Sequence, residues 1–179
     1  HLRPPSLPDT QPPSPFRFQD KVSVGSPVVW RFPTWGVAAQ GTTIAVTNAS
    51  ESISADTVSL LNSISGELLR EFSLPDGCEP RGLDTQGDLC AVTCWGLERV
   101  VFFSITTGQE IGAKGGINVG KNPIDVRISG NIVAIVNHGS DNVSFIRLDR
   151  LTEFPQQVNV GKSPIAISAL NGQFFVRTV

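Results

Sequence analysis

Residues 119–123 are Val-Gly-Lys-Asn-Pro, and residues 160–164 are Val-Gly-Lys-Ser-Pro. The two stretches differ at one position and begin 41 residues apart. In both, a glycine follows the proline after seven or eight residues, and an apolar run begins soon after that glycine. A junction that recurs at this spacing predicts a chain built from copies of one structural unit.

The same pattern occurs four times along the chain, at spacings of 47, 43 and 41 residues. The prolines are Pro33, Pro80, Pro123 and Pro164. The glycines that follow them are Gly41, Gly87, Gly130 and Gly172. In the first three copies an alanine lies four residues beyond the glycine, at Ala45, Ala91 and Ala134. A small residue at a repeated position is expected where sheets approach one another closely.

Each copy consists of short segments rich in apolar and β-branched residues, separated by turn residues. None of them keeps a 3.6-residue apolar period, so we expect almost no helix. Four strands in 41–47 residues is the size of one β-propeller blade. Strands such as residues 132–136 are apolar without alternation, as expected when neighbouring sheets cover both faces. The sequence predicts an all-β propeller; a two-layer sandwich has no such repeat, and a β-helix usually has a shorter coil.

The repeat also divides the chain into units. The predicted units are blades at 33–74, 75–117 and 118–158 and a half blade of two strands at 159–179. Residues 16–32 resemble the outer, third and fourth strands of a blade, because Val24-Gly25 matches the Val-Gly pair of the two junctions. Residues 1–15 contain six prolines and are expected to be an extended arm or linker.

These units leave three ways to complete a ring. The chain is part of a larger propeller, or it pairs with a second copy so that two half-rings complete each other. Alternatively, it closes alone as about four blades, with the N-terminal strands filling the half blade and hiding its edge. An unpartnered half-ring would leave apolar sheet faces exposed.

The composition fits a globular domain and excludes several classes of protein. The chain has 179 residues, of which 40% are apolar and 17% charged, with a net charge of −2. Because 14 basic residues face 16 acidic ones, no excess positive charge is available for binding nucleic acid. No apolar run is long enough to span a membrane as a helix. The chain begins at His1 and lacks Met, so we expect a processed or excised chain.

Residues 118–158 carry a family resemblance. The Val-Gly…Pro entry at 119–123, the glycine at 130, the apolar strand 133–137 that ends in Asn, and Asn-Val-Ser at 142–144 are similar to YVTN-type propeller repeats. This family lies within the lactonase-like and surface-layer propeller group. The resemblance implies a ring that typically has seven blades and a secreted, periplasmic or cell-surface location. It also implies either ligand binding or lactonase-like hydrolysis.

Candidate metal-binding or catalytic groups are three carboxylates. Asp84 and Asp125 fall in the predicted innermost strands of adjacent blades, which line the central channel, and Glu79 lies nearby in sequence. Carboxylates that converge in a channel can bind Ca²⁺ or act as a general base. The alternative, which we favour, is that they are channel-wall groups hydrogen-bonded to water or backbone.

Candidate binding residues lie near the ends of predicted strands. Trp35 and Trp95 could lie on one rim of the ring and stack on a sugar or a peptide, and His138 falls in a loop after a second strand. Packing of the tryptophans between blades is the favoured alternative. His138 is expected to be a solvated loop residue, because no cluster of Cys or His surrounds it.

The three cysteines leave the redox state open. Cys90 and Cys94 lie on one predicted strand, about 13 Å apart, which is too far for a disulfide. A Cys78–Cys94 disulfide needs a hairpin between the two residues, and we favour three buried free thiols instead. Asn48 and Asn142 each begin an Asn-x-Ser tripeptide, a glycosylation pattern that is common by chance.

The leading functional hypothesis is a non-catalytic binding or scaffold propeller that presents its loop rims to a protein, peptide or glycan and needs no cofactor. The alternative is a lactonase-like hydrolase, or a piece of one, whose central channel holds a metal such as Ca²⁺ through Asp84, Asp125 and Glu79. The candidate partners include a second copy of the chain and the remainder of a split propeller.

Overall fold

The computed structural model describes residues 35–49 and 56–179, and this part of the chain is almost entirely β-sheet. The predicted arm at 1–15 and the predicted outer strands at 16–32 lie outside the described residues. Within the described ranges no α-helix occurs, and the only helical pieces are two 3₁₀ turns, η1 (His138–Ser140) and η2 (Leu148–Arg150). The expectation of an all-β chain is confirmed.

Three antiparallel sheets have four strands each, and a fourth has two. Blade 1 contains β1 (Val37–Gln40), β2 (Thr43–Asn48), β3 (Thr57–Asn62) and β4 (Leu68–Ser73). Blade 2 contains β5 (Pro80–Gln86), β6 (Leu89–Cys94), β7 (Arg99–Ser104) and β8 (Ile117–Asn118). Blade 3 contains β9 (Pro123–Ser129), β10 (Ile132–Asn137), β11 (Asn142–Arg147) and β12 (Gln156–Asn159). The half blade contains β13 (Pro164–Leu170) and β14 (Gln173–Thr178).

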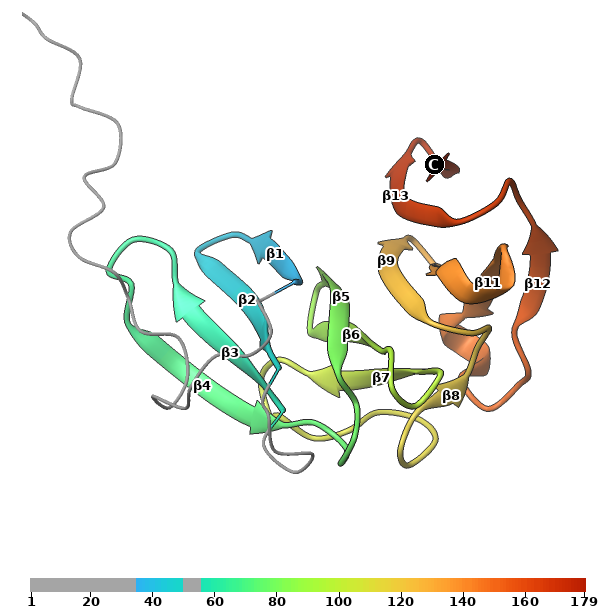
Figure 1. Cartoon of the computed structure of the whole chain (residues 1–179). Helices are drawn as coiled ribbons and strands as arrows, with labels where there is room; N and C mark the ends of the chain where they lie inside the picture. Colours follow the sequence, from blue (N-terminus) through green and yellow to red (C-terminus); the bar gives the residue numbers. More distant parts are fainter. Residues whose placement is uncertain (1–34, 50–55) are drawn as a thin grey trace, which may run out of the picture.

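The first strands of the four units lie side by side along the inner side of an open arc (Figure 1). Strand β5 contacts both β1 and β9, and β9 contacts β13. The remaining strands of each blade follow outward in chain order, ending at β4, β8 and β12. This meander, repeated around a common axis, is the architecture of a β-propeller, as predicted from the repeat.

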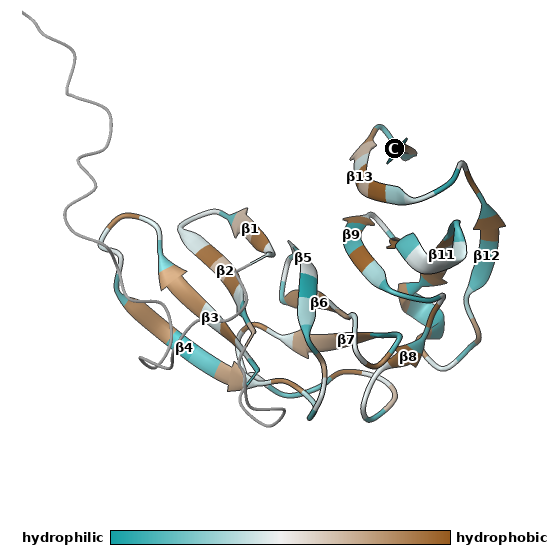
Figure 2. Cartoon of the chain, viewed as in Figure 1, coloured by the Kyte–Doolittle hydropathy of each residue, from teal (hydrophilic) through white to brown (hydrophobic). Residues whose placement is uncertain are grey.

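The hydrophobic core consists of three clusters, each between two successive units. The central strands of blade 2 illustrate the reason, since Cys90, Val92 and Cys94 face blade 1 while Ala91 packs toward blade 3. Both faces of the sheet are therefore apolar, and Figure 2 shows hydrophobic segments on β2, β3 and β9. The third cluster joins blade 3 to the half blade through Ala134, Val136, Val143 and Ile167.

Side chains of one inner strand also bind the backbone of the next. Asp84 in β5 accepts a hydrogen bond from the backbone N–H of Ile128 in β9, at 2.7 Å. Asp125 in β9 accepts one from the N–H of Ile167 in β13, at 2.9 Å. An inner strand is the edge of its sheet, so these carboxylates satisfy backbone donors that have no partner strand.

The last residue of the second strand is a repeated bridging position. Asn137 donates from its amide nitrogen to Asn142 Oδ1 at 2.7 Å and Ser144 Oγ at 2.8 Å. Asn48 donates in the same way to Thr57 and Ser59. Asn48 and Asn142, the two residues of the glycosylation pattern, are therefore buried and engaged in packing between the second and third strands.

The inner strands approach closely at Gly82. A Cβ atom there would lie 2.6 Å from Asp125 Cα and 2.9 Å from Ile124 O, both of which are backbone atoms of the neighbouring blade. By contrast, Gly87 in a hairpin turn has a φ of +60°, and no atom lies within 4 Å of the point that a Cβ atom would occupy there. The two glycines therefore serve different purposes, since one permits blade contact and the other permits a turn.

We expect Gly82→Ala to lower the free energy of unfolding by about 3 kcal/mol, because it forces blades 2 and 3 apart. Gly87→Ala is the matched control and costs about 1 kcal/mol, since it strains only the turn. Urea denaturation of both variants measures the difference. Equal costs at the two positions would contradict the close approach of the inner strands.

Candidate functional site

One rim of the arc is formed by two kinds of loop, those that enter the inner strands and those that join second to third strands. In blade 2 the backbone N–H groups of Trp95 and Gly96 donate to Glu79 O and Cys78 O. In blade 3 His138 and Gly139 donate to Asn122 O and Lys121 O in the same pattern. This repeated pairing places the side chains of both loop types on a common surface, which we call the entry rim.

A disulfide between Cys78 and Cys94 adds a covalent link to this pairing in blade 2. Cys94 occupies the position of Asn48 and Asn137 at the end of the second strand, where the other blades use hydrogen bonds. The favoured expectation of three free thiols therefore differs from the structure. The two chain segments reach each other because the inner strand β5 folds back as a hairpin with β6.

Only Cys90 is a free cysteine among the described residues. It is buried between blades 1 and 2, and this burial raises the pKa of its thiol to about 12, with a smaller contribution from the nearby Asp84 charge. A thiol is reactive mainly as the thiolate, so Cys90 is a packing residue.

The predicted rim residues Trp35, Trp95 and His138 lie in one row, and a fourth residue, Arg81, lies between the two tryptophans. The Arg81 guanidinium lies 4.7 Å from the Trp35 ring centroid and 5.2 Å from the Trp95 ring centroid. The Trp95 and His138 rings are stacked at 6.2 Å, and His138 Nδ1 is 3.1 Å from the carbonyl oxygen of Pro164. Trp35, Arg81, Trp95 and His138, which we call the rim row, thus cross from blade 1 to the edge of the half blade.

Arg81 is the residue that the sequence interpretation missed. It directly follows Pro80, where the next two copies have Ile124 and Ile165 after their prolines. A cation where the two later copies have isoleucine was the available signal. Burial lowers the pKa of the Arg81 guanidinium, the nearby Glu79 charge acts in the opposite direction, and Nε has no hydrogen-bond partner among the described residues.

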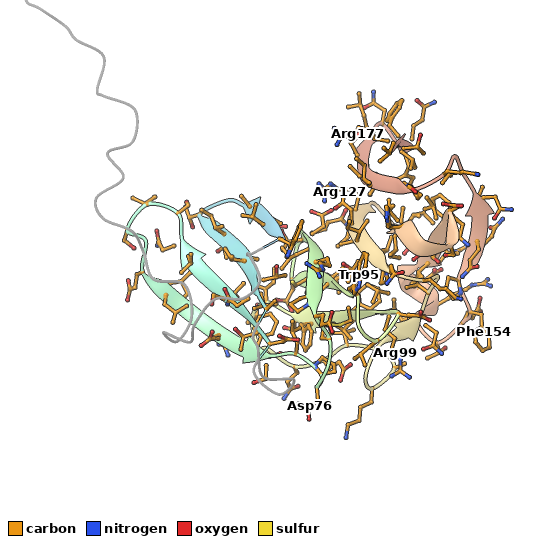
Figure 3. The ribbon with its side chains drawn as sticks, viewed as in Figure 1. Asp76, Trp95, Arg99, Arg127, Phe154 and Arg177 are labelled. Atoms are coloured by element: carbon orange, nitrogen blue, oxygen red, sulfur yellow. A yellow bond between two sulfur atoms is a disulfide. The ribbon has the colours of Figure 1, made fainter. Side chains whose placement is uncertain are left out.

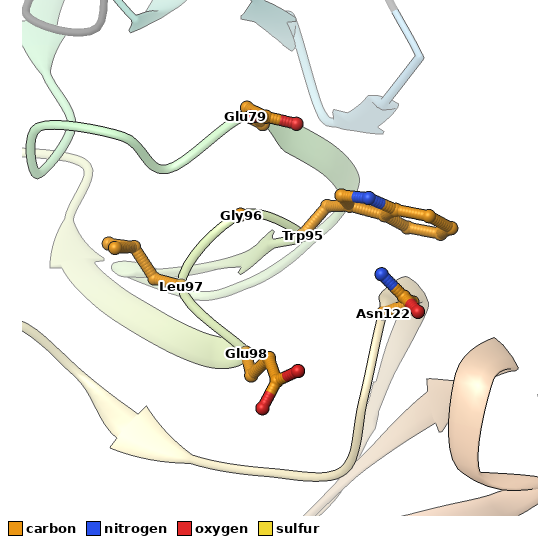
Figure 4. A pocket seen from close by; sticks show the side chains of 6 residues that line it. All are labelled: Glu79, Trp95, Gly96, Leu97, Glu98 and Asn122. Carbon is orange, nitrogen blue, oxygen red and sulfur yellow. The ribbon is translucent and has the colours of Figure 1, made fainter.

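A hollow of about 500 Å³ adjoins the rim row (Figure 4). Its polar side chains are Glu79, Glu98 and Asn122, and Trp95 forms part of its wall. The three polar residues have positive φ angles of 48°, 54° and 52°. Because Ser163 and Asp141 repeat this backbone conformation in later copies, the strain belongs to the blade junction and not to the hollow alone. The hollow presents two carboxylates beside an indole.

The three predicted channel carboxylates do not form one site. Glu79 lines the rim hollow, whereas Asp125 borders a separate hollow of about 430 Å³ along the inner strands, with Trp35 and Arg127. Figure 3 shows Arg127 beside β9, on the inner side of the arc. Asp84 lies in β5, and its oxygens accept from Thr85 N and Ile128 N. In the part of the chain that the structure describes, no group of three or more metal-ligating side chains occurs.

Asp125 is held mainly by protein donors. Its Oδ1 accepts from Val126 N and from Arg127 Nη1, at 3.1 Å for the latter, and its Oδ2 accepts from Ile167 N. Burial nevertheless raises its pKa, and the Asp84 charge adds to this, although the hydrogen bonds and the Arg127 charge oppose it. Both inner-strand carboxylates therefore join neighbouring blades through backbone hydrogen bonds.

Comparisons with known proteins support the fold alone. Neither a protein-family model nor a curated protein sequence matches the chain. Virginiamycin B lyase from Staphylococcus aureus is similar in structure, with a TM-score of 0.63 and 12% identity over 81% of this chain and 48% of that one. Hydrazine synthase from Kuenenia stuttgartiensis has a TM-score of 0.65 and 18% identity over 80% of this chain and 41% of that one. The computationally designed Ika4 protein has a TM-score of 0.59 and 14% identity over 84% of this chain and 94% of that one.

The chain therefore spans less than half of the two natural proteins and nearly all of Ika4. The likeness places it among β-propeller structures. Among the described residues, no helix has the length and apolar character needed to cross a membrane.

We expect thiol titration to distinguish the disulfide from three free cysteines. The native protein should show no thiol that reacts rapidly with a disulfide reagent, because Cys90 is buried. In denaturant without reductant one thiol per chain should react, and after reduction three. The Cys90→Ala variant should show none before reduction, and three reactive thiols in unreduced wild type would contradict the Cys78–Cys94 link.

The pH dependence of stability should report the environment of Asp125. Because its pKa is raised in the folded protein, its contribution to stability is fully present below the ordinary aspartate pKa of about 3.9 and falls as the pH rises through the folded pKa. The free energy of unfolding of wild type, minus that of Asp125→Asn, should therefore decrease with rising pH in urea denaturation. For Asp149→Asn the difference should increase with pH, because Arg147 lowers the pKa of Asp149. If this difference in the free energy of unfolding changed in the same direction with pH for both variants, the opposite pKa shifts of Asp125 and Asp149 would be contradicted.

Proposed function

We propose that the chain is a non-catalytic binding module built on YVTN-type propeller repeats, with the entry rim as its binding surface. The observation that carries this proposal is the rim row, in which Arg81 joins two tryptophans from neighbouring blades beside an acidic hollow. Trp35 is 53% exposed although it is a large aromatic residue, so it has surface available to a partner. Exposed aromatic residues beside charged groups are common at recognition sites.

The chemistry of the rim favours a peptide or protein segment with a basic side chain. Glu79 and Glu98 supply two carboxylates to the hollow, and Asn122 supplies an amide. A lysine or arginine of the partner would bind these groups by charge-assisted hydrogen bonds. Apolar or planar groups of the same segment would pack on Trp35. A glycan would also stack on Trp35, but it gains less from two neighbouring carboxylates.

The alternative function is a lactonase-like hydrolase, or part of one, with Ca²⁺ in the channel. The geometry favours the hydrolase less than the binding module. Glu79 lines a different hollow from Asp125. Asp84 and Asp125 accept hydrogen bonds from backbone N–H groups of the neighbouring blade. Elemental analysis of the purified protein for bound metal tests this alternative. Stoichiometric calcium that is lost in Asp84→Asn would favour the hydrolase over the binding module.

The location that we propose is secreted, periplasmic or at a cell surface. The Cys78–Cys94 disulfide supports it, since such bonds persist in oxidising compartments and are rare in the cytosol.

The binding proposal is tested with fluorescein-labelled hexapeptides that carry a central Lys or Arg, together with matched peptides that carry a central Glu. In fluorescence anisotropy, the basic peptides should bind and the acidic peptides should not. Glu98→Gln should weaken binding by about tenfold, because it removes one charged acceptor. Trp35→Ala should weaken it by a similar factor, through loss of aromatic packing.

Glu153→Gln is the control, because Glu153 is an exposed carboxylate that contacts Arg150 outside the entry rim. It should leave peptide affinity unchanged. Equal binding of basic and acidic peptides would refute the proposed ligand chemistry, as would retention of full affinity in Glu98→Gln. Binding of a neutral oligosaccharide that depends on Trp35 but not on Glu98 would support a glycan ligand instead.

A further inference from the structure

The Arg81 guanidinium lies at the entry rim without a hydrogen-bond acceptor. It lies over the Trp35 ring at 4.7 Å and over the Trp95 ring at 5.2 Å, so two indoles hold it in place. Its Nε atom is buried, and among the described residues no hydrogen bond or ion pair joins the guanidinium to another group. The nearby Glu79 charge acts on it without forming an ion pair. Strong donors that lack acceptors require an explanation.

A carboxylate of a ligand would satisfy these donors. The contacts of Arg81 with the two indoles leave both Nη atoms free to donate. The planar guanidinium presents parallel N–H groups that match the two oxygens of a carboxylate. Because the indoles already hold the side chain, binding costs little additional conformational entropy. Arg81 therefore has the geometry and the unpaired donors of a carboxylate-binding group.

Glu98 carries a second charge that the blade does not use. The residue before the third strand is Asp56 in blade 1, Glu98 in blade 2 and Asp141 in blade 3. Asp56 accepts a hydrogen bond from the backbone N–H of Glu79 at 2.8 Å, and Asp141 accepts one from that of Ser163 at 2.7 Å. Within the described ranges, the Glu98 carboxylate accepts no corresponding hydrogen bond. It lines the rim hollow instead.

The negative and positive groups lie around one indole. Trp95 forms the wall of the hollow together with Glu79 and Glu98, and its ring also contacts Arg81 (Figure 4). The Glu79 carboxylate packs closely on Gly96, where a Cβ atom would lie 3.2 Å from Glu79 Oε1. Opposite charges therefore border the same aromatic side chain. A single amino-acid residue that carries both a cation and an anion can reach the two groups at once.

We propose that the entry rim recognises the carboxyl-terminal residue of a peptide when that residue is Lys or Arg. The free α-carboxylate pairs with Arg81, and the basic side chain extends along Trp95 to Glu79 and Glu98. Lysine carries its ammonium on a flexible four-carbon stem, and the apolar stem packs on the indole. This inference rests on the proposed binding of basic peptide segments and specifies which part of the peptide binds.

A terminal carboxylate fits the rim better than an acidic side chain elsewhere in the peptide. The α-carboxylate and the basic side chain of a terminal Lys belong to one residue, so one ordered side chain brings both charges to the rim. An internal Lys beside an Asp or Glu offers the same charges, but two side chains must then lose conformational freedom. The carboxyl-terminal residue therefore makes the same contacts at a lower cost in entropy.

The proposal is tested with three hexapeptides of equal composition that carry fluorescein at the N-terminus. The first ends in Lys with a free carboxylate, and the second ends in Lys with a carboxamide. The third has Lys at its third position and a free carboxylate. In fluorescence anisotropy, wild-type protein should bind the first about tenfold more tightly than either of the others, because only the first carries both charges on one residue. Equal affinities for the first and second peptides would overturn the proposal.

Arg81→Gln removes the guanidinium and should make the affinities for the first and second peptides equal. Arg150→Gln is the matched control, because Arg150 is an exposed cation that contacts Glu153 outside the entry rim. It should keep the tenfold preference for the free carboxylate. An unchanged preference in Arg81→Gln would also overturn the proposal. The comparison in wild type changes only the peptide, so it remains decisive if Arg81→Gln does not fold.

The outcomes separate this inference from the binding function on which it rests. If peptides with a central Lys bind and depend on Glu98, but the free terminal carboxylate adds no affinity, the inference is wrong and the binding function stands. If no basic peptide binds, both are wrong. Free L-lysine that displaces the first peptide as well as its unlabelled form does would overturn recognition of a peptide end in favour of a free amino acid.

Discussion

The structure depends on one constraint, which is that the central strands of blades 2 and 3 are apolar on both faces and are buried between neighbouring sheets. Alternation of polar and apolar residues protects an ordinary exposed sheet, but β6 and β10 have no polar face to present to water. The repeated alanine lets successive sheets approach closely, and Gly82 permits the inner strands to do the same. The carboxylates of Asp84 and Asp125 then satisfy backbone donors at the edge of the neighbouring sheet.

The same constraint explains why the rim is the part of the chain free to vary. Positions between blades are restricted by packing, while the loops at the entry rim carry residues that break the repeat. Arg81 replaces an isoleucine, and Cys94 replaces an asparagine that bridges two strands. Trp35, Arg81, Trp95 and His138 connect successive units without belonging to any of the three cores. Departures from a repeat are thus informative about function, because packing does not demand them.

The constraint also makes the two ends of the arc the least satisfied parts of the molecule. Val37 and Phe175 occupy positions that packing buries in the other copies, and both are exposed at the ends of the arc.

The sequence by itself determined the all-β class, the four-stranded unit and the places of the inner strands, because the junction at 119–123 recurs at 160–164 and turn residues mark each hairpin. It also offered Trp35, Trp95 and His138 as candidate binding residues because they fall near strand ends, although it favoured packing between blades for the tryptophans and a solvated loop for His138. Only the tertiary structure decided that Arg81 joins them, that Glu79 lies apart from Asp84 and Asp125, and that Cys78 meets Cys94. These facts depend on distances between loops of different blades, and such distances follow from how the sheets are rotated about the common axis, which no local sequence pattern encodes.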